Sequence, residues 1–243
     1  MLLEPEVVWP AVEADRLLLA DWAARWTPTN WESPTPCTEW VARELVAHIV
    51  AMATASKSHG MWTYVRAGAN LDATSHVLAD EVVAGRTDAQ ILDLLRQHAG
   101  AQHTSPGLRP VGILAELVTH LEDLSVAIGE AVQLPADHLV ATLVYLQRRT
   151  RANTRFHLSL HGREPVLDGA ARTAGLLLRA TDIEWTHDPA APTDPRDEPA
   201  EVRASVEGSA AALILAMAGR QIGPDTPVGR LTGDGAAQIL APR

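Results

Sequence analysis

The residues with the clearest potential for chemistry are a glutamate and a histidine four positions apart. Glu116 and His120 lie in a stretch with helical apolar spacing, which brings both side chains to one face of a helix. That face also carries apolar residues, so the pair is expected to point into a helical core, where an unpartnered carboxylate is costly. A divalent metal ion suits both groups, because carboxylate oxygen and imidazole nitrogen are zinc ligands. A plain Glu–His pair on the helix surface is the alternative.

His48 is a candidate for a third ligand, because it lies on a second segment with helical apolar spacing. A lone histidine on an apolar face is usually a hydrogen-bonded core residue. Together with Glu116 and His120, however, it would give three protein ligands from two helices, which leaves open positions on a catalytic metal. Glu44 and His48 repeat the same spacing. The two helices could therefore supply a symmetric pair of ligands. Di-iron bundles, however, use Glu-x-x-His with two further glutamates, and the spacing here differs, so we interpret Glu44 as a first-turn surface residue.

Three further groups of residues need an interpretation. Asp123 follows His120 by three residues, and we expect it to hydrogen-bond a ligand histidine or a reacting proton. The single cysteine, Cys37, excludes an internal disulfide and a cysteine-based zinc cluster, and we interpret it as a packed small residue. The other histidines are expected to be solvated or to lie near a strand or hinge; they are His59, His76, His98, His103 and His138 in the first group, and His157 and His161 in the second.

The elements that must position these residues are mostly helices. Apolar periodicity predicts helices over about 9–25, 39–57, 74–84, 88–98, 111–128 and 135–153. Thr38 is expected to cap the helix that carries His48, and Gly129 to end the helix that carries Glu116 and His120. Four substantial helices joined by loops predict an up-and-down bundle.

The last third of the sequence changes character. Alternating apolar and polar residues predict strands over 175–186, 202–207 and 228–232, with a short helix over 209–218 and a proline-rich loop from 188 to 199. The fold class is therefore multi-domain, α followed by α+β. Residues 1–154 form the helical bundle, and residues 155–243 form a small α+β domain.

Composition limits the partners. The chain has 243 residues and a net charge of −10, which disfavours binding to nucleic acid. No run of about 18 apolar residues exists, so a membrane span is not expected. The first residues lack the basic region of a secretory signal, which predicts a cytoplasmic protein. No glycine-rich phosphate loop, nucleophile elbow or dinucleotide fingerprint is present.

One ordered set of motifs runs through the helical part: Trp31, the run Pro34–His48, Glu116, His120, Asp123, Leu124 and Gly129. Together these motifs resemble the mycothiol-dependent maleylpyruvate isomerase family, which belongs to the DinB-like metal-binding helical bundles. The segments 212–220 and 231–235 resemble the sterol-carrier-like second domain of that family. The resemblance covers nearly the whole chain.

The resemblance implies a metal site and a thiol cofactor. His48, Glu116 and His120 match the ligands of a divalent metal, most often zinc, and mycothiol would be the low-molecular-weight thiol. Arg220 matches a catalytic arginine that suits a dicarboxylate substrate; a helix-end arginine bonding carbonyl oxygens is the alternative. Arg220 and Asp123 are thus the candidate catalytic residues.

The implied reaction is a cis–trans isomerisation. A metal-bound thiol loses its proton, and the thiolate adds to the activated double bond of a cis-dienoate. Rotation and elimination then give the trans isomer. Two alternatives stay open: a mycothiol S-transferase that acts on electrophiles or a secondary metabolite, and a non-enzymatic metal- or ligand-binding protein. The substrate is expected to be a small molecule, and the sequence leaves the oligomeric state open.

Overall fold

The computed structural model describes residues 5–37, 40–104, 109–148, 172–191 and 199–241. Most of them are helical, and three strands form a small sheet, which confirms the predicted fold class at this level. The helices are α1 (Pro5–Ala23), α2 (Pro28–Trp31), α3 (Ala42–Thr54), α4 (Lys57–Arg66), α5 (Leu71–Val83), α6 (Asp88–Gln97), α7 (Pro110–Ile128), α8 (Ala136–Arg148), α10 (Ala210–Met217) and α11 (Ala236–Leu240). The strands are β1 (Leu176–Ala180), β2 (Thr186–His187) and β3 (Ala204–Gly208).

Helix α7 is the central element of the helical part. It packs against α1, α3, α8 and α10 and is buried along almost its whole length. Pro110 opens it at the position where a missing N–H costs nothing, and Gly129 ends it with a φ of 77°. Because neighbours surround the helix, polar residues on it must find partners inside the protein.

Helix α3 is shorter than predicted. It begins at Ala42 after the cap residue Val41, whose N–H donates to the carboxylate of Glu44. The residue that caps α3 is therefore Val41; the predicted cap, Thr38, lies outside the described residues. Extended backbone at Ala55 ends the helix, and the side chain of Ser56 caps a separate helix, α4, which was not predicted from the sequence.

The sheet has the order β2-β1-β3, with β1 antiparallel to β2 and parallel to β3. The predicted strand 175–186 is thus two short strands with a turn between them. The predicted strand 228–232 is wrong, because only an isolated bridge joins Thr232 to Glu207. The glycine after that bridge, Gly233, has a φ of 100°, and a Cβ there would lie 2.4 Å from the carbonyl oxygen of Ser205. The chain turns there into α11.

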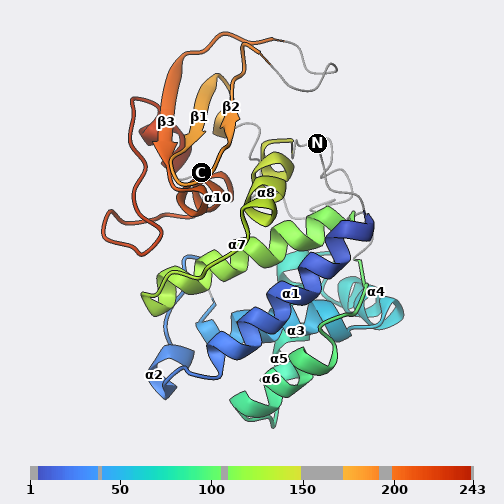
Figure 1. Ribbon diagram of the computed structural model, residues 1–243. Helices are drawn as coiled ribbons and strands as arrows, with labels where there is room; N and C mark the ends of the chain where they lie inside the picture. The colour runs from blue at the N-terminus through green and yellow to red at the C-terminus, as the bar shows by residue number, and fades with distance from the viewer. Residues whose placement is uncertain (1–4, 38–39, 105–108, 149–171, 192–198, 242–243) are drawn as a thin grey trace.

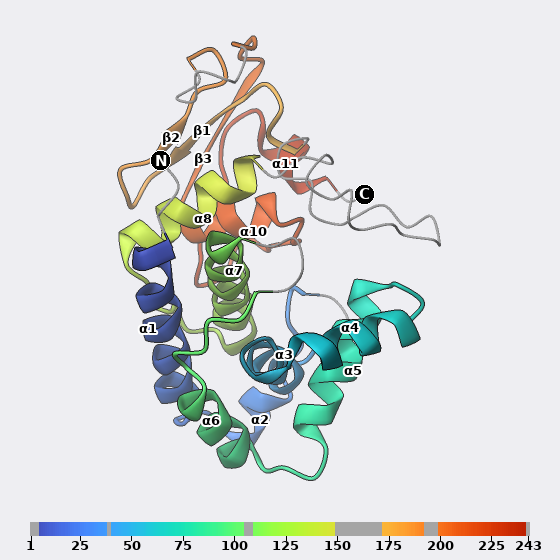
Figure 2. The same ribbon diagram turned by 90° about the vertical axis from the view of Figure 1, so that its right-hand side faces the viewer.

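Helices α8 and α10 lie between the helices α1–α7 and the sheet (Figures 1 and 2). Helix α10 contacts α7, α8, β3 and α11, and all its residues except Ala211 are buried. The predicted domain boundary after residue 154 lies outside the described residues, as do His157 and His161.

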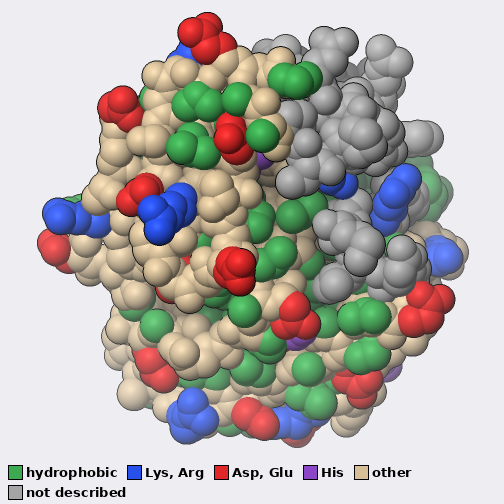
Figure 3. All heavy atoms as spheres, turned by 45° about the horizontal axis from the view of Figure 1, so that its top comes forward, with side chains coloured by type: hydrophobic (Ala, Val, Ile, Leu, Met, Phe, Trp, Pro, Cys, Tyr) green, Lys and Arg blue, Asp and Glu red, His purple; other side chains and the backbone are tan. Residues whose placement is uncertain are grey.

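The surface and the helix lengths add two observations. On the face shown in Figure 3, acidic and basic side chains are scattered singly among apolar ones. Among the described residues, no helix combines the length and the apolar character that crossing a membrane requires.

Candidate metal site

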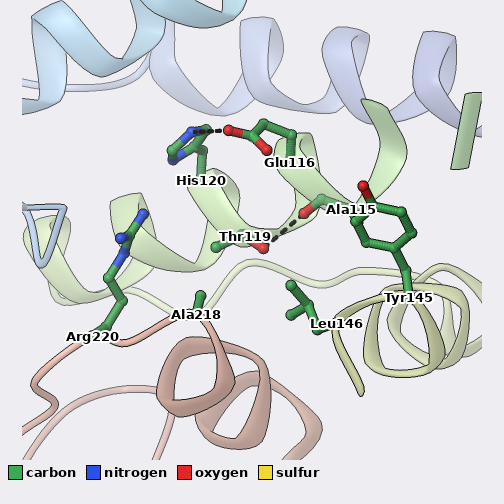
Figure 4. A pocket seen from close by; sticks show the side chains of 8 residues that line it. All are labelled: Ala115, Glu116, Thr119, His120, Tyr145, Leu146, Ala218 and Arg220. Atoms are coloured by element: carbon green, nitrogen blue, oxygen red, sulfur yellow. Dashed lines mark hydrogen bonds and ion pairs between the residues drawn. The ribbon is translucent and has the colours of Figure 1, made fainter. Parts of the chain in front are cut away.

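The structure brings the three predicted ligands together. His48 projects from α3, and Glu116 and His120 project from α7, with one ligating atom of each within 4.8 Å of the others. Nε2 of His120 lies 3.6 Å from Oε1 of Glu116 (Figure 4). The rings of His48 and His120 meet edge to face, with centroids 5.2 Å apart. Two imidazoles and one carboxylate are a ligand set found in catalytic zinc sites.

Burial sets the protonation of the two histidines differently. Burial, followed by the charge of His120, lowers the pKa of His48 to about 3. His48 is therefore neutral, the form in which imidazole binds a metal. Burial also disfavours the charged form of His120, but hydrogen bonds with Asp123 and Glu116 outweigh it and raise its pKa. A metal at Nε2 of His120 would displace a proton.

Asp123 holds the other side of His120. Nδ1 of His120 donates to Oδ2 of Asp123 at 3.1 Å, and the carboxylate has no exposed surface. Burial would raise the pKa of Asp123, but the charge of Arg220 and the bond with His120 lower it below its usual value. Carboxylates often fix metal-binding histidines in this way, because the bond sets the tautomer and the ring orientation. Nε2 of His120 is thereby left facing Glu116.

Arg220 reaches the same carboxylate from the other part of the chain. It follows α10, and its Nε and Nη2 donate to the two oxygens of Asp123 at 2.9 and 3.1 Å. Burial would lower the pKa of Arg220, but Asp123 raises it, so the guanidinium stays charged. Among the described residues, its side chain bonds no helix carbonyl, which distinguishes it from a helix-end arginine. Arg220, Asp123 and His120 form one connected chain of hydrogen bonds.

Cys37 lies closer to this site than the sequence suggested. One atom each of Cys37, His120 and Asp123 lies within 4.8 Å of the others, which makes a second candidate ligand group. Burial, opposed by Arg220, raises the pKa of the Cys37 thiol to about 12. Because Asp123 is already paired with Arg220 and Cys37 is protonated, we favour the group of His48, Glu116 and His120.

Two histidines that were expected to be solvated are not. The ring of His76 on α5 stacks on Trp40, with centroids 4.1 Å apart and planes at 13°. His138 is buried, and its Nδ1 lies 3.0 Å from both carboxylate oxygens of Asp15 on α1. No periodicity marks either contact, because the partners are distant in the sequence. His59, His98 and His103 are exposed, as predicted.

A small hollow lies beside the proposed ligands (Figure 4). It is lined by Ala115, Glu116, Thr119 and His120 of α7, Tyr145 and Leu146 of α8, and Ala218 and Arg220 after α10. The hollow has room for little more than a water molecule. A larger ligand would require Tyr145, Leu146 or other lining side chains to move.

The site draws on separate elements of the chain: α3 and α7 supply two histidines and a glutamate, and the segment after α10 supplies an arginine. A solved structure of a mutant of the mycothiol-dependent maleylpyruvate isomerase has a similar fold. It covers 96% of this chain and 94% of its own, with a TM-score of 0.55 and 14% sequence identity. A second structure of that enzyme covers the same shares, with a TM-score of 0.49 and 15% identity.

The first of these similarities, at 14% identity, shows the overall fold alone. No family model matches the sequence. No curated protein matches it either.

Proposed function

We propose that this protein is a metal- and mycothiol-dependent enzyme that isomerises a cis-dienoate similar to maleylpyruvate. The observation that carries the proposal is the convergence of His48, Glu116 and His120 within 4.8 Å, in a chain whose fold is similar to that of the mycothiol-dependent maleylpyruvate isomerase. Zinc is the proposed ion, because two imidazoles and one carboxylate leave a zinc ion an open position. When bound, such an ion lowers the pKa of a coordinated thiol.

The residues around the ligands supply positioning and charge. Asp123 keeps the Nδ1–H of His120 occupied, so that Nε2 is the nitrogen presented to the ion. Arg220 uses Nε and Nη2 for Asp123, and among the described residues Nη1 makes no hydrogen bond. We propose that Nη1 binds a carboxylate of the substrate, since a buried guanidinium is a strong carboxylate partner.

The identity of the two domains is part of the same proposal. Residues 1–154 are proposed to be a DinB-like bundle, and residues 155–243 a sterol-carrier-like domain. The described helices of the first segment and the three-stranded sheet of the second are compatible with this division. A small-molecule substrate, a low-molecular-weight thiol and a cytoplasmic location complete the proposal.

The decisive experiment is turnover of maleylpyruvate by the zinc-loaded protein with and without mycothiol. We expect isomerisation only when both zinc and mycothiol are present, and loss of it in His48→Ala. Activity in the absence of any thiol would contradict the mechanism. Consumption of mycothiol together with an electrophile, without isomerisation of maleylpyruvate, would instead identify an S-transferase.

A further inference from the structure

The two histidines of the candidate metal site are held in different ways. His120 donates its Nδ1–H to Asp123, the usual arrangement for a metal-binding imidazole. His48 has no such partner, since within the described ranges neither of its ring nitrogens makes a hydrogen bond. A ligand ring without that bond needs another device to fix its orientation, because rotation about the side-chain torsions would carry the nitrogen away from the site.

Trp40 supplies a rigid surface against His48. The two ring centroids are 5.3 Å apart, with the planes at 53°. The backbone of Trp40 is itself fixed, because its carbonyl oxygen accepts hydrogen bonds from both the N–H and the hydroxyl of Thr35, at 3.1 and 3.0 Å. Trp40 therefore stands at a defined position two residues before α3 begins.

His76 contacts the same indole. It stacks on the Trp40 ring with centroids 4.1 Å apart and planes at 13°, so the indole packs against both His76 and His48. Helix α5, which carries His76, packs closely against α3, which carries His48. The rings of His76, Trp40, His48 and His120 form a continuous series of contacts that ends at the proposed ligands. Stacked and edge-to-face contacts of this kind add stability beyond the buried area.

We infer that Trp40, stacked against His76, is the positioning residue for His48. It takes the place of the hydrogen bond that orients His120, and it acts through the ligand without touching the metal or substrate. This inference rests on the proposed metal site. It predicts that substitutions of Trp40 or His76 alter the geometry of the bound metal as well as stability. Substitution of an ordinary core residue would alter stability alone.

The test is Co²⁺ binding to the full chain, followed by the visible absorption bands that report ligand geometry. Trp40→Leu removes the ring, Trp40→Phe keeps an aromatic ring, and Trp62→Leu is a matched control at an exposed tryptophan on α4. We expect Trp40→Leu to weaken Co²⁺ binding by about tenfold or more and to alter the spectrum, as losses of outer-shell support do. Trp40→Phe should keep part of the Co²⁺ affinity and part of the wild-type spectrum. Trp62→Leu should change neither the affinity nor the spectrum.

A second pair of variants tests whether His76 supports Trp40. His76→Ala removes the stacked ring, and His59→Ala removes an exposed histidine that pairs with Glu81 instead. His76→Ala should shift the Co²⁺ spectrum in the same direction as Trp40→Leu, whereas His59→Ala should not. This pair also keeps the inference testable if Trp40→Leu does not fold. A folded Trp40→Leu or His76→Ala protein with the wild-type dissociation constant and spectrum would overturn the inference.

One further measurement separates this inference from the proposed function. If the wild-type chain binds no Co²⁺ and His48→Ala changes nothing, the metal function is overturned. The positioning contact is then read from carbon–proton NMR signals of the His48 ring in metal-free protein. These signals should move more in Trp40→Leu than in Trp62→Leu, because the indole ring current is lost; equal, small shifts in both variants would overturn the contact.

Discussion

Arg220 and Asp123 lie 97 positions apart in the chain, yet the guanidinium of one donates hydrogen bonds to both carboxylate oxygens of the other. The Asp123 side chain is wholly buried, and the Arg220 side chain is only 10% exposed. The pair ties the segment after α10 to α7, and through Asp123 it also contacts His120. The carboxylate of Asp123 thus serves both the contact between α7 and the segment after α10 and the proposed catalytic site.

Breaking this pair from one side should destabilise the protein strongly. Asp123→Asn leaves the buried guanidinium without a counter-charge, and we expect the free energy of unfolding to fall by about 3–5 kcal/mol. Urea denaturation monitored by circular dichroism measures the loss. The double variant Asp123→Asn/Arg220→Met should lose less than the sum of the two single variants. Additive losses would mean that the two side chains are not coupled.

The proposed catalytic role of Arg220 predicts an effect on turnover. With zinc and mycothiol supplied, Arg220→Ala should lower kcat/KM for maleylpyruvate by on the order of 10²-fold, because a charged substrate contact is lost. Bound zinc, measured by elemental analysis, should stay at the wild-type ratio. Arg220→Lys controls for loss of charge, and it should remain impaired if the planar guanidinium is required.

Metal content provides a direct check of the ligand assignment. His120→Ala should abolish stoichiometric zinc, since it removes one of three ligands and the bond that Asp123 receives. His59→Ala, at an exposed histidine, should retain zinc. Both proteins are loaded with zinc, dialysed together and measured by mass spectrometry of the metal. Unchanged zinc in His120→Ala would reject the site.

Cys37 should be dispensable as a nucleophile. Burial raises the pKa of its thiol to about 12, so little thiolate exists at neutral pH despite its position near His120 and Asp123. Cys37→Ser should therefore keep isomerase activity when mycothiol is supplied. In the folded wild-type protein, iodoacetamide should alkylate Cys37 far more slowly than after unfolding. An inactive Cys37→Ser that still folds and binds zinc would point to a cysteine-based mechanism.

The buried pair of His138 and Asp15 should make stability depend on pH. Burial disfavours the imidazolium, but the hydrogen bond and charge of Asp15, with Asp137 nearby, raise the pKa of His138 above 6.5. The folded state therefore binds this proton more tightly than the unfolded state does. The resulting stability is fully present below pH 6.5 and is lost as the pH rises through the raised pKa.

His138→Asn isolates this contribution, because its amide can still donate to Asp15 but does not titrate. The unfolding free energy of the wild type minus that of His138→Asn should be largest at pH 5–6 and should shrink toward pH 9. Urea titrations across this range provide the comparison. A difference that stays constant with pH would show that His138 has the same pKa in both states.

Local patterns predicted much of the helical part. Pro110 and Gly129 mark the two ends of α7 in the sequence, and the spacing of Glu116 and His120 places them together whatever else the chain does. The predicted helix over 39–57 ran past the end of α3, and α4 was not predicted, because the polar run from Ser56 to His59 gives its first turn no apolar periodicity. Only the extended conformation of Ala55 ends α3, and no proline or glycine announces it.

Contacts between distant segments could not be predicted in the same way. The bond of Arg220 to Asp123, the approach of Cys37 to His120, and the stack of His76 on Trp40 all depend on how separate elements pack. The chemical type of a side chain limits which groups it can bind, but it does not identify the residue that the folded chain places beside it. The strand predicted over 228–232 failed for a related reason: alternation permits a strand, but only a neighbouring strand in register makes one.

Every residue of helix α10 except Ala211 is buried, and this limits where the chain can be cut. A fragment that ends before residue 199 would leave uncovered the apolar surfaces of α7 and α8 that α10 contacts. A fragment that begins there would keep β3 and α11 against α10 but would expose the apolar side of α10 that packs on α7 and α8. Each fragment would expose an apolar surface and would be prone to aggregate. Tags and reporter fusions are therefore better attached to the termini of the intact chain than inserted near residue 199.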